Sequence, residues 1–120
     1  MRNIEFTYLY RDGGNYKKWG RVIFSNPTRL RLNAVEKALR ANFMADGLFI
    51  ADQIRLPEVF FNFRGEATSD DHCFHEYYSL TETRSKPNDG HLRSIGAFIS
   101  EVRREARRGW REFDPTTTRC

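Results

Sequence analysis

The stretch of the chain with the most chemically active side chains is residues 70–76, which read Asp-Asp-His-Cys-Phe-His-Glu. Imidazole nitrogen, thiolate sulfur and carboxylate oxygen are the groups that bind zinc and related metals in proteins. One hypothesis is therefore a metal-assisted hydrolase or nuclease. Its candidate residues are Asp70 or Asp71, His72, His75 and Glu76.

The spacing of these residues argues against one shared metal ion. The aromatic content of residues 72–82 indicates a strand, and side chains alternate between the two faces of a strand. This places His72 and Glu76 on one face and Cys73 and His75 on the other. The order also differs from the helical zinc-protease motif, in which two histidines enclose a glutamate. We predict no catalytic residue and no cofactor, and His72, His75 and Glu76 remain metal candidates only if another segment completes a site.

A second candidate is the segment 10–21, Tyr-Arg-Asp-Gly-Gly-Asn-Tyr-Lys-Lys-Trp-Gly-Arg. Basic and aromatic side chains together can neutralise phosphates and stack on bases. The segment lacks the GxxxxGK[ST] spacing of a phosphate-binding loop, and its two glycines equally suit an ordinary hairpin turn. The predicted binding residues here are Arg11, Tyr16, Lys17, Lys18, Trp19 and Arg21.

The C-terminal part of the chain is rich in arginine. Arg103, Arg107 and Arg111 recur every four residues, so on a helix they share one face as mutually repelling neighbours unless an outside anion lies among them. Other arginines have partners within the helix, at the spacings of Glu101 with Arg104, Glu105 with Arg108, and Arg108 with Glu112. We predict that Arg103, Arg107 and Arg111 bind an anionic partner. The alternative is an exposed face without a ligand.

The net charge of +4 hides an uneven distribution along the chain. Residues 1–40 carry nine basic and three acidic groups (+6), residues 41–90 four and nine (−5), and residues 91–120 seven and four (+3). Basic groups gathered on one face suit nucleic acid, whereas separated signs also suit docking on a protein of complementary charge. Composition leaves both partners open.

The pattern of apolar residues predicts one α+β domain over residues 1–113 and a flexible tail over 114–120. Alternating apolar residues indicate strands, and apolar residues three or four apart indicate helices. The order is β-β-α-β-β-α, which favours an antiparallel sheet covered on one face by two helices. Residues 57–63 are ambiguous, and Asn88 or Asp89 is the expected cap of the last helix. The expected elements are strands at 4–11, 19–26, 48–54 and 72–82 and helices at 31–43 and 92–110.

Three segments, YRDGGNYKKWGRVIFSNP, LFIADQI and DDHCFHEY, resemble a group of small, uncharacterised bacterial proteins. The resemblance spans roughly residues 4–82 and leaves out the arginine-rich last helix. It implies no activity and transfers no functional residue. If the first hairpin and the fourth strand are neighbours in one sheet, Arg11, Asp12, His72 and Glu76 are expected to cluster at one end of it.

These observations favour a small, non-enzymatic binding module that engages nucleic acid or an acidic protein surface. An inhibitor or adaptor that docks on a larger complex, including one encoded by a mobile element, fits the same features. The metal-assisted hydrolase or nuclease is the third reading. No apolar run approaches the roughly 20 residues that cross a bilayer, and Glu5 interrupts any signal-peptide pattern, so we expect a cytoplasmic protein without a membrane partner.

Overall fold

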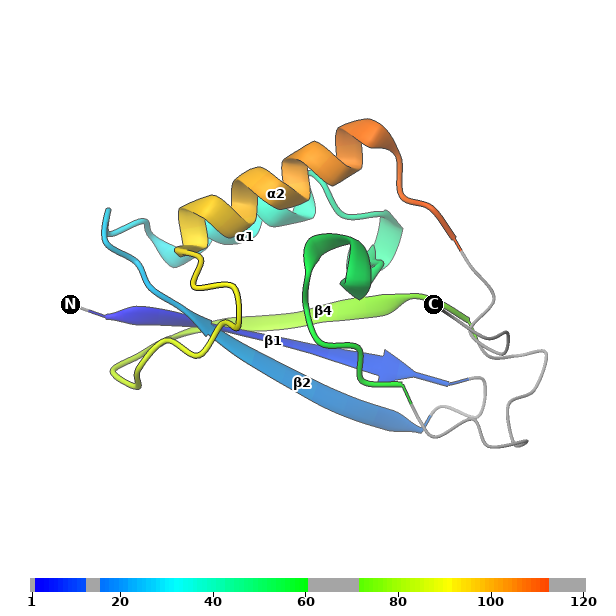
Figure 1. Cartoon of the computed structure of the whole chain (residues 1–120), viewed down its shortest axis with the longest axis horizontal. Coiled ribbons are helices and arrows are strands. Elements are labelled where there is room, and N and C mark those ends of the chain that lie inside the picture. Colours follow the sequence, from blue (N-terminus) through cyan, green and yellow to red (C-terminus); the bar gives the residue numbers. More distant parts are fainter. Residues whose placement is uncertain (1, 13–15, 61–71, 113–120) are drawn as a thin grey trace.

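The computed structural model describes residues 2–12, 16–60 and 72–112. The predicted tail and residues 61–71, which include the candidates Asp70 and Asp71, lie outside these ranges. Two short 3₁₀ turns, Ala45–Gly47 and Ala51–Ile54, flank the smallest strand. The elements (Figure 1) are β1 (Asn3–Arg11), β2 (Lys17–Phe24), α1 (Leu32–Arg40), β3 (Leu48–Phe49), β4 (His75–Thr83) and α2 (Ile95–Arg108).

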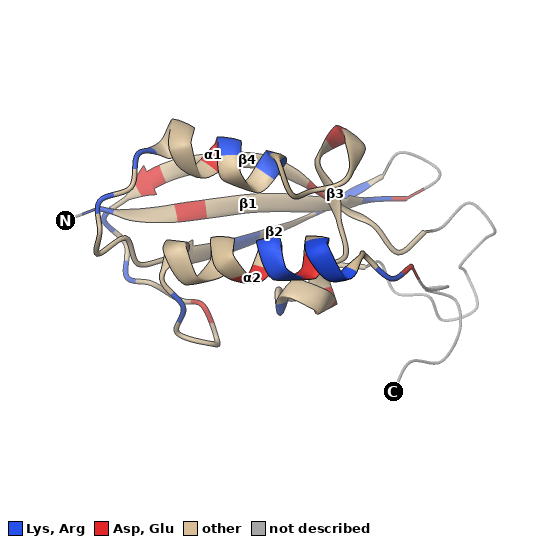
Figure 2. Cartoon of the chain, turned by 90° about the horizontal axis from the view of Figure 1, so that it is seen from above, with Lys and Arg blue, Asp and Glu red and all other residues tan. Residues whose placement is uncertain are grey.

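The four strands form one sheet in the order β2-β1-β4-β3, and every neighbouring pair is antiparallel. Strand β1 lies in the interior of the sheet because it pairs with both β2 and β4. Both helices lie on the same side of the sheet, with α1 over β4 and α2 over β2 (Figures 1 and 2). The α+β class and the antiparallel sheet predicted from the sequence are confirmed.

Aromatic side chains fill the space between the sheet and the helices. Phe6, at the middle of β1, is fully buried, and its ring lies within 6.3 Å, centroid to centroid, of five other rings. A buried aromatic ring removes roughly 150 to 250 Å² from water, so a few such residues can stabilise a small domain. The five rings belong to Tyr8, Phe43, Phe49, Tyr77 and Phe98.

Gly20 of β2 makes room for the buried ring of Tyr8. The two residues pair across β1 and β2, and a Cβ atom at position 20 would lie 2.5 Å from Tyr8 Cζ. The Tyr8 hydroxyl donates a hydrogen bond to the carbonyl of Pro57. This bond holds the segment after Ala51–Ile54 against the side of the hairpin that faces the core. A glycine is therefore required here by the close approach of a side chain.

Several predicted elements have wrong boundaries, including the third strand and the last helix. The strand expected at 48–54 ends at Phe49, and the chain then forms a 3₁₀ turn that buries Ala51 and Ile54. A short apolar run cannot by itself distinguish a strand from a helical turn. The last helix begins only at Ile95, and its cap is Ser94, whose hydroxyl accepts a hydrogen bond from the Ala97 amide.

Asp89, one of the two residues expected to cap the last helix, belongs instead to a buried ion cluster just before α2. Arg93 is 6% exposed, makes two hydrogen bonds to the carboxylate of Asp89, and contacts Glu101 at 3.2 Å. Its guanidinium also lies over the rings of Phe24 and Phe98. Burial alone would raise the pKa of Asp89, but the hydrogen bonds from Arg93 outweigh it and hold that pKa below its usual value.

Leu92, expected in the apolar stripe of the last helix, is 92% exposed. Its φ of 55° is left-handed, so it cannot belong to an α-helix. The neighbouring Arg93 points inward to the ion cluster, and this turn of the chain directs Leu92 outward.

Candidate nucleic-acid interface

The side of the sheet away from the helices is built by alternate residues of the strands. Because Tyr8 and Tyr10 of β1 are buried in the core, Leu9 and Arg11 point to the opposite side. The register of the hairpin places Trp19 opposite Leu9. We call this surface the outer face and define it by Glu5, Thr7, Leu9, Arg11, Lys17, Trp19, Arg21, Glu76 and Tyr78.

Tyr78 lies on the outer face at a bulge in β4. Thr7 pairs with Ser79 and Tyr8 pairs with Tyr77, so Tyr78 is an extra residue at the point where the register shifts. Bulges of this kind re-aim a side chain. The Tyr78 ring meets the Trp19 ring edge to face, with centroids 4.7 Å apart and planes at 82°.

The Trp19–Tyr78 pair bridges two strands that are not neighbours. Trp19 lies on β2 and Tyr78 on β4, so their rings meet across β1, beside Leu9, which is only 1% exposed. Trp19 is 44% exposed and Tyr78 60% exposed. The pair shields one apolar side chain and still offers a large part of its own aromatic surface to solvent.

Charged groups surround this aromatic pair. Arg11 makes a bidentate ion pair with Glu76, at 3.1 Å and 3.2 Å, which raises the pKa of the guanidinium. Lys17 and Arg21 are exposed and make no ion pair within the described residues. Three basic groups against Glu5 and Glu76 leave the outer face with a net charge of +1.

The predicted binding residues of the hairpin do not all lie on the same face. Arg11, Lys17, Trp19 and Arg21 share the outer face. The alternation along β2 turns Lys18 the other way, and its Nζ donates to the carbonyl of Phe60 at 3.3 Å. Tyr16, just before β2, is 71% exposed, and its amide donates to the Asp12 carboxylate at 2.8 Å.

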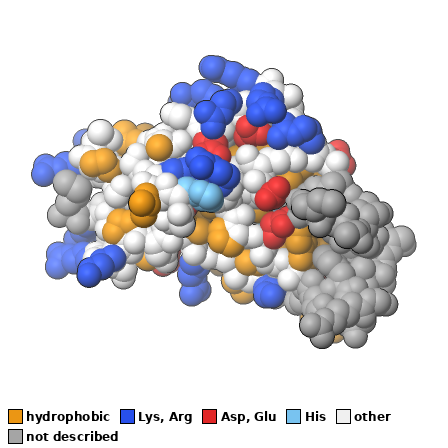
Figure 3. All heavy atoms as spheres, viewed as in Figure 1, with side chains coloured by type: hydrophobic (Ala, Val, Ile, Leu, Met, Phe, Trp, Pro, Cys, Tyr) orange, Lys and Arg blue, Asp and Glu red, His pale blue; other side chains and the backbone are white. Residues whose placement is uncertain are grey.

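The predicted arginine stripe of the last helix is wrong at its C-terminal end. Arg103 and Arg107 are exposed on α2, but α2 stops at Arg108, and Arg111 lies beyond it. Arg111 instead pairs with Glu105 at 2.6 Å. Arg103 and Arg107 line a shallow hollow of about 480 Å³ together with Ser100, Arg104 and Arg108. Basic residues are coloured along α2 in Figure 2, and basic side chains gather at the α2 side of the molecule in Figure 3.

The basic residues of α2 and those of the hairpin do not form one surface. Helix α2 lies over the inner face of the sheet, whereas Lys17, Trp19 and Arg21 lie on the outer face (Figure 1). The two predicted halves of the binding site are therefore on opposite layers of the molecule. Of the predicted pairs within α2, Glu105 with Arg108 is confirmed at 3.5 Å, but Glu101 contacts Arg55 and Arg93 instead of Arg104.

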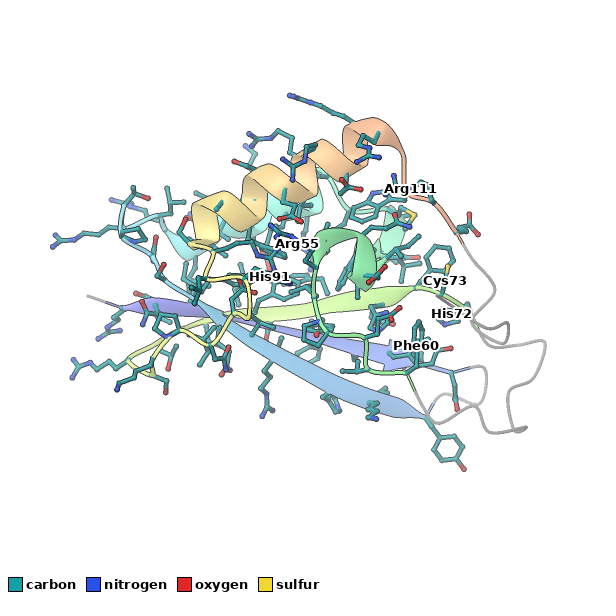
Figure 4. All side chains as sticks on the ribbon, in the orientation of Figure 1. Arg55, Phe60, His72, Cys73, His91 and Arg111 are labelled. Atoms are coloured by element: carbon teal, nitrogen blue, oxygen red, sulfur yellow. The ribbon has the colours of Figure 1, made fainter. Side chains whose placement is uncertain are left out.

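The prediction that His72 shares a face with Glu76 is wrong. Strand β4 begins at His75, so strand alternation does not extend back to His72. The rings of His72 and His75 both contact the ring of Tyr10 on the core side, at 5.0 Å and 5.5 Å between centroids. Glu76 alone reaches the outer face. Figure 4 shows His72 beside Phe60 and Cys73 at this end of the sheet.

Both ring nitrogens of His72 are hydrogen-bonded to backbone groups. Its Nε2 donates to the Arg11 carbonyl at 2.7 Å, and its Nδ1 accepts from the Phe74 amide at 3.0 Å. Of the predicted cluster of Arg11, Asp12, His72 and Glu76, the structure joins Arg11 to Glu76 through its side chain and to His72 through its carbonyl, whereas Asp12 bonds to Tyr16. The bond to Arg11 ties His72 to β1, and binding a metal through a ring nitrogen of His72 would require one of the two His72 bonds to break.

His75 is buried among aromatic rings and is 1% exposed. Its Nε2 accepts a hydrogen bond from the Val59 amide at 3.0 Å. Burial, and to a smaller extent the nearby His72, lowers the pKa of His75 to about 4. The side chain is thus neutral at physiological pH. Within the described residues, no group of three or more potential ligands is arranged to hold a metal ion.

No protein-family model, curated protein sequence or solved structure matches this chain. Among the described residues, none of the helices has the length and apolar character required to span a bilayer.

Tyr78 is the outer-face residue that sequence reasoning missed. Its only signal is the adjacent pair Tyr77 and Tyr78, because neighbouring residues of a strand face opposite ways. Tyr77 is buried and its hydroxyl donates to Glu36 at 2.6 Å, so Tyr78 is left for the outer face. The resulting surface has what stacking on a planar group requires, namely exposed aromatic rings with cations beside them.

Proposed function

We propose that this protein is a non-enzymatic binding module that holds single-stranded nucleic acid on its outer face. The observation that carries the proposal is the exposed Trp19–Tyr78 pair on a sheet surface that neither α1 nor α2 covers. Trp19 and Tyr78 stack on bases, and Lys17 and Arg21 contact the flanking phosphates. Stacking of a base on an aromatic side chain contributes roughly 1 to 3 kcal/mol.

Electrostatics supports a limited role for phosphates at this site. The Arg11 charge is largely engaged by Glu76, which leaves Lys17 and Arg21 as the cations for two phosphates. For single strands, each neutralised phosphate adds about −0.7 to the slope of log affinity against log salt concentration. We therefore expect a slope of roughly −1.4, shallow for a nucleic-acid-binding protein.

The test is a fluorescence titration of the full chain with short, mixed-sequence single-stranded DNA and RNA. Trp19→Ala should weaken binding by about 5- to 150-fold, the equivalent of one lost base stack. Trp19→Phe should retain part of the affinity. Replacing Lys17 and Arg21 together by Gln should flatten the salt dependence.

The matched control removes two charges from the opposite layer. Replacing Arg103 and Arg107 by Gln changes the net charge equally but leaves the outer face intact. Affinity should fall much less in this variant than in the Lys17 and Arg21 variant. The reverse ranking, with Trp19→Ala unaffected, would move the interface to α2, and the absence of binding at low salt would remove the proposal.

A further inference from the structure

Among the residues that the structure describes, strand β2 lies at one edge of the sheet, so the backbone groups on its far side from β1 do not pair with another strand. Ile23 donates its amide hydrogen to Asn88 Oδ1 at 2.7 Å, and its carbonyl accepts from the Asn88 amide at 3.0 Å. Both Ile23 groups therefore point away from β1. In an antiparallel ladder, alternate residues point the same way, so Lys17, Trp19 and Arg21 also direct their amides and carbonyls outward.

Asn88 closes the edge at Ile23 only. It supplies one donor and one acceptor, as a residue of a neighbouring strand would. Within the described part of the chain, the backbone groups of Lys17, Trp19 and Arg21 have no hydrogen-bond partner, and all three residues are exposed. Three donors and three acceptors thus remain in register along one side of the sheet, which is the arrangement that an added strand pairs with.

The side chains of this edge determine which strand fits. Lys17 and Arg21 project to the outer face and Lys18 to the inner face, so basic groups flank the edge on both sides. An extended segment with acidic side chains would place its carboxylates beside these groups. Opposite charges on paired strands stabilise the pair.

The same charges oppose pairing with a second copy of β2. Two copies aligned antiparallel about Trp19 would place Lys17 of each copy directly opposite Arg21 of the other. Like charges in this position are destabilising, and basic edges are one means by which sheets avoid self-association. The charge of the edge therefore favours an acidic segment over a second copy of β2.

A recess lies beside the Arg21 end of the edge. It has a volume of about 480 Å³ and is lined by residues that include Arg21, Arg55, Asn88 and His91. Arg55 and His91 approach each other to 3.5 Å, and Figure 4 shows them together above β2. Asp52 and Asp89 line the recess as well, and Arg55 pairs with Glu101, so the recess ends the open edge without adding to its positive charge.

We propose that the edge of β2 from Lys17 to Arg21 accepts an extended, acidic segment of a partner protein as a fifth strand. This goes beyond nucleic-acid binding, because it uses the backbone of β2 and not the rings of the outer face. The two can be separated experimentally, since Trp19→Ala and Tyr78→Ala remove the rings but leave every backbone donor.

The test uses a capped synthetic peptide in which Glu alternates with Val, titrated into the full chain and followed by backbone amide NMR. Binding should shift the amides of Lys17, Trp19 and Arg21 and slow their hydrogen exchange, while those of Lys18 and Gly20, which face β1, change less. A peptide in which Lys replaces Glu should not bind. A peptide N-methylated on the amides that face β2 should also lose binding.

The matched protein variants are Arg21→Gln and Arg21→Pro. Both remove the charge, but only proline removes the outward amide hydrogen, and it leaves the bonds between β1 and β2 in place. Arg21→Pro should bind the Glu-Val peptide about five- to tenfold more weakly than Arg21→Gln, the effect of one hydrogen bond. Circular dichroism of the two variants reports whether the fold is kept.

Three results would overturn the proposal. Equal binding of the N-methylated peptide would show that the contact does not use the edge backbone, and this result is independent of whether Arg21→Pro folds. Concentration-dependent dimerisation that shifts the same amides would assign the edge to a second copy. No binding of the Glu-Val peptide at low salt would leave the basic edge as a protection against self-association only.

Discussion

The inner and outer faces of the sheet both carry aromatic residues, but in different surroundings. On the inner face, Phe6 and Tyr8 are fully buried and touch other rings. On the outer face, Trp19 and Tyr78 contact each other, Trp19 lies opposite the buried Leu9 in the strand register, and both rings remain widely exposed. Aromatic content therefore does not separate core from interface. The helices do, because they cover only one side.

This comparison predicts that inner-face substitutions cost stability and outer-face substitutions cost binding. The largest effect is expected for Phe6→Ala, because it empties the centre of the aromatic cluster. Truncation of a buried Phe typically costs about 3 to 5 kcal/mol of unfolding free energy. Urea unfolding measures it, and a loss below 1 kcal/mol would contradict the assignment of Phe6 to the core.

A similar loss, about 3 to 5 kcal/mol, is expected for Arg93→Ala, which leaves Asp89 and Glu101 buried without their partner. Arg103→Ala is the matched control, because Arg103 is exposed and should change stability by less than about 0.5 kcal/mol. Equal effects of the two substitutions in denaturant unfolding would mean that the buried ion cluster does not stabilise the fold.

Acid should destabilise the protein through His75. Its pKa is about 4 in the folded chain and about 6.5 when unfolded, so the unfolded chain binds more protons between these values. The contribution of His75 to the free energy of unfolding is therefore complete above pH 6.5, and up to about 3 kcal/mol of it is lost as the pH decreases to 4. Urea unfolding across this range should show a weaker pH dependence for His75→Gln, and an unchanged profile would refute the role of His75.

Gly20→Ala should cost about 1 to 3 kcal/mol, because its new Cβ overlaps the ring of Tyr8, which is buried and held by its hydrogen bond to Pro57. Gly96→Ala is the control. A Cβ there meets nothing closer than Ser94 Oγ at 3.8 Å, so helix propensity should make this change neutral or stabilising. Thermal melts of both variants compare the two positions.

The smallest effect on stability is expected for Trp19→Ala, at about 1 kcal/mol. The substitution removes one partner of an exposed aromatic pair and uncovers Leu9, but it leaves the inner core intact. The same variant is expected to lose most of its affinity for single-stranded nucleic acid. A stability loss as large as that of Phe6→Ala would instead make the outer pair part of the core.

Local patterns were sufficient for the elements with a clear period. The alternation of Ile4, Phe6, Tyr8 and Tyr10 predicted β1, which spans Asn3–Arg11. Elements without a clear period, and the ends of the last helix, were misplaced because contacts elsewhere in the molecule decide them. His72 illustrates this, since its side depends on bonds to Arg11 and Phe74 and not on its position in a strand.

For the candidate site, the sequence alone determined that basic and aromatic residues alternate near the first hairpin and that arginines concentrate in the last helix. Only the tertiary structure decided which of them are available. Trp19 is joined by Tyr78 through a bulge, Arg11 is engaged by Glu76, and Arg93 is buried. The physical reason is that exposure and charge pairing depend on residues far apart in the chain, which are brought together only when the sheet and helices pack.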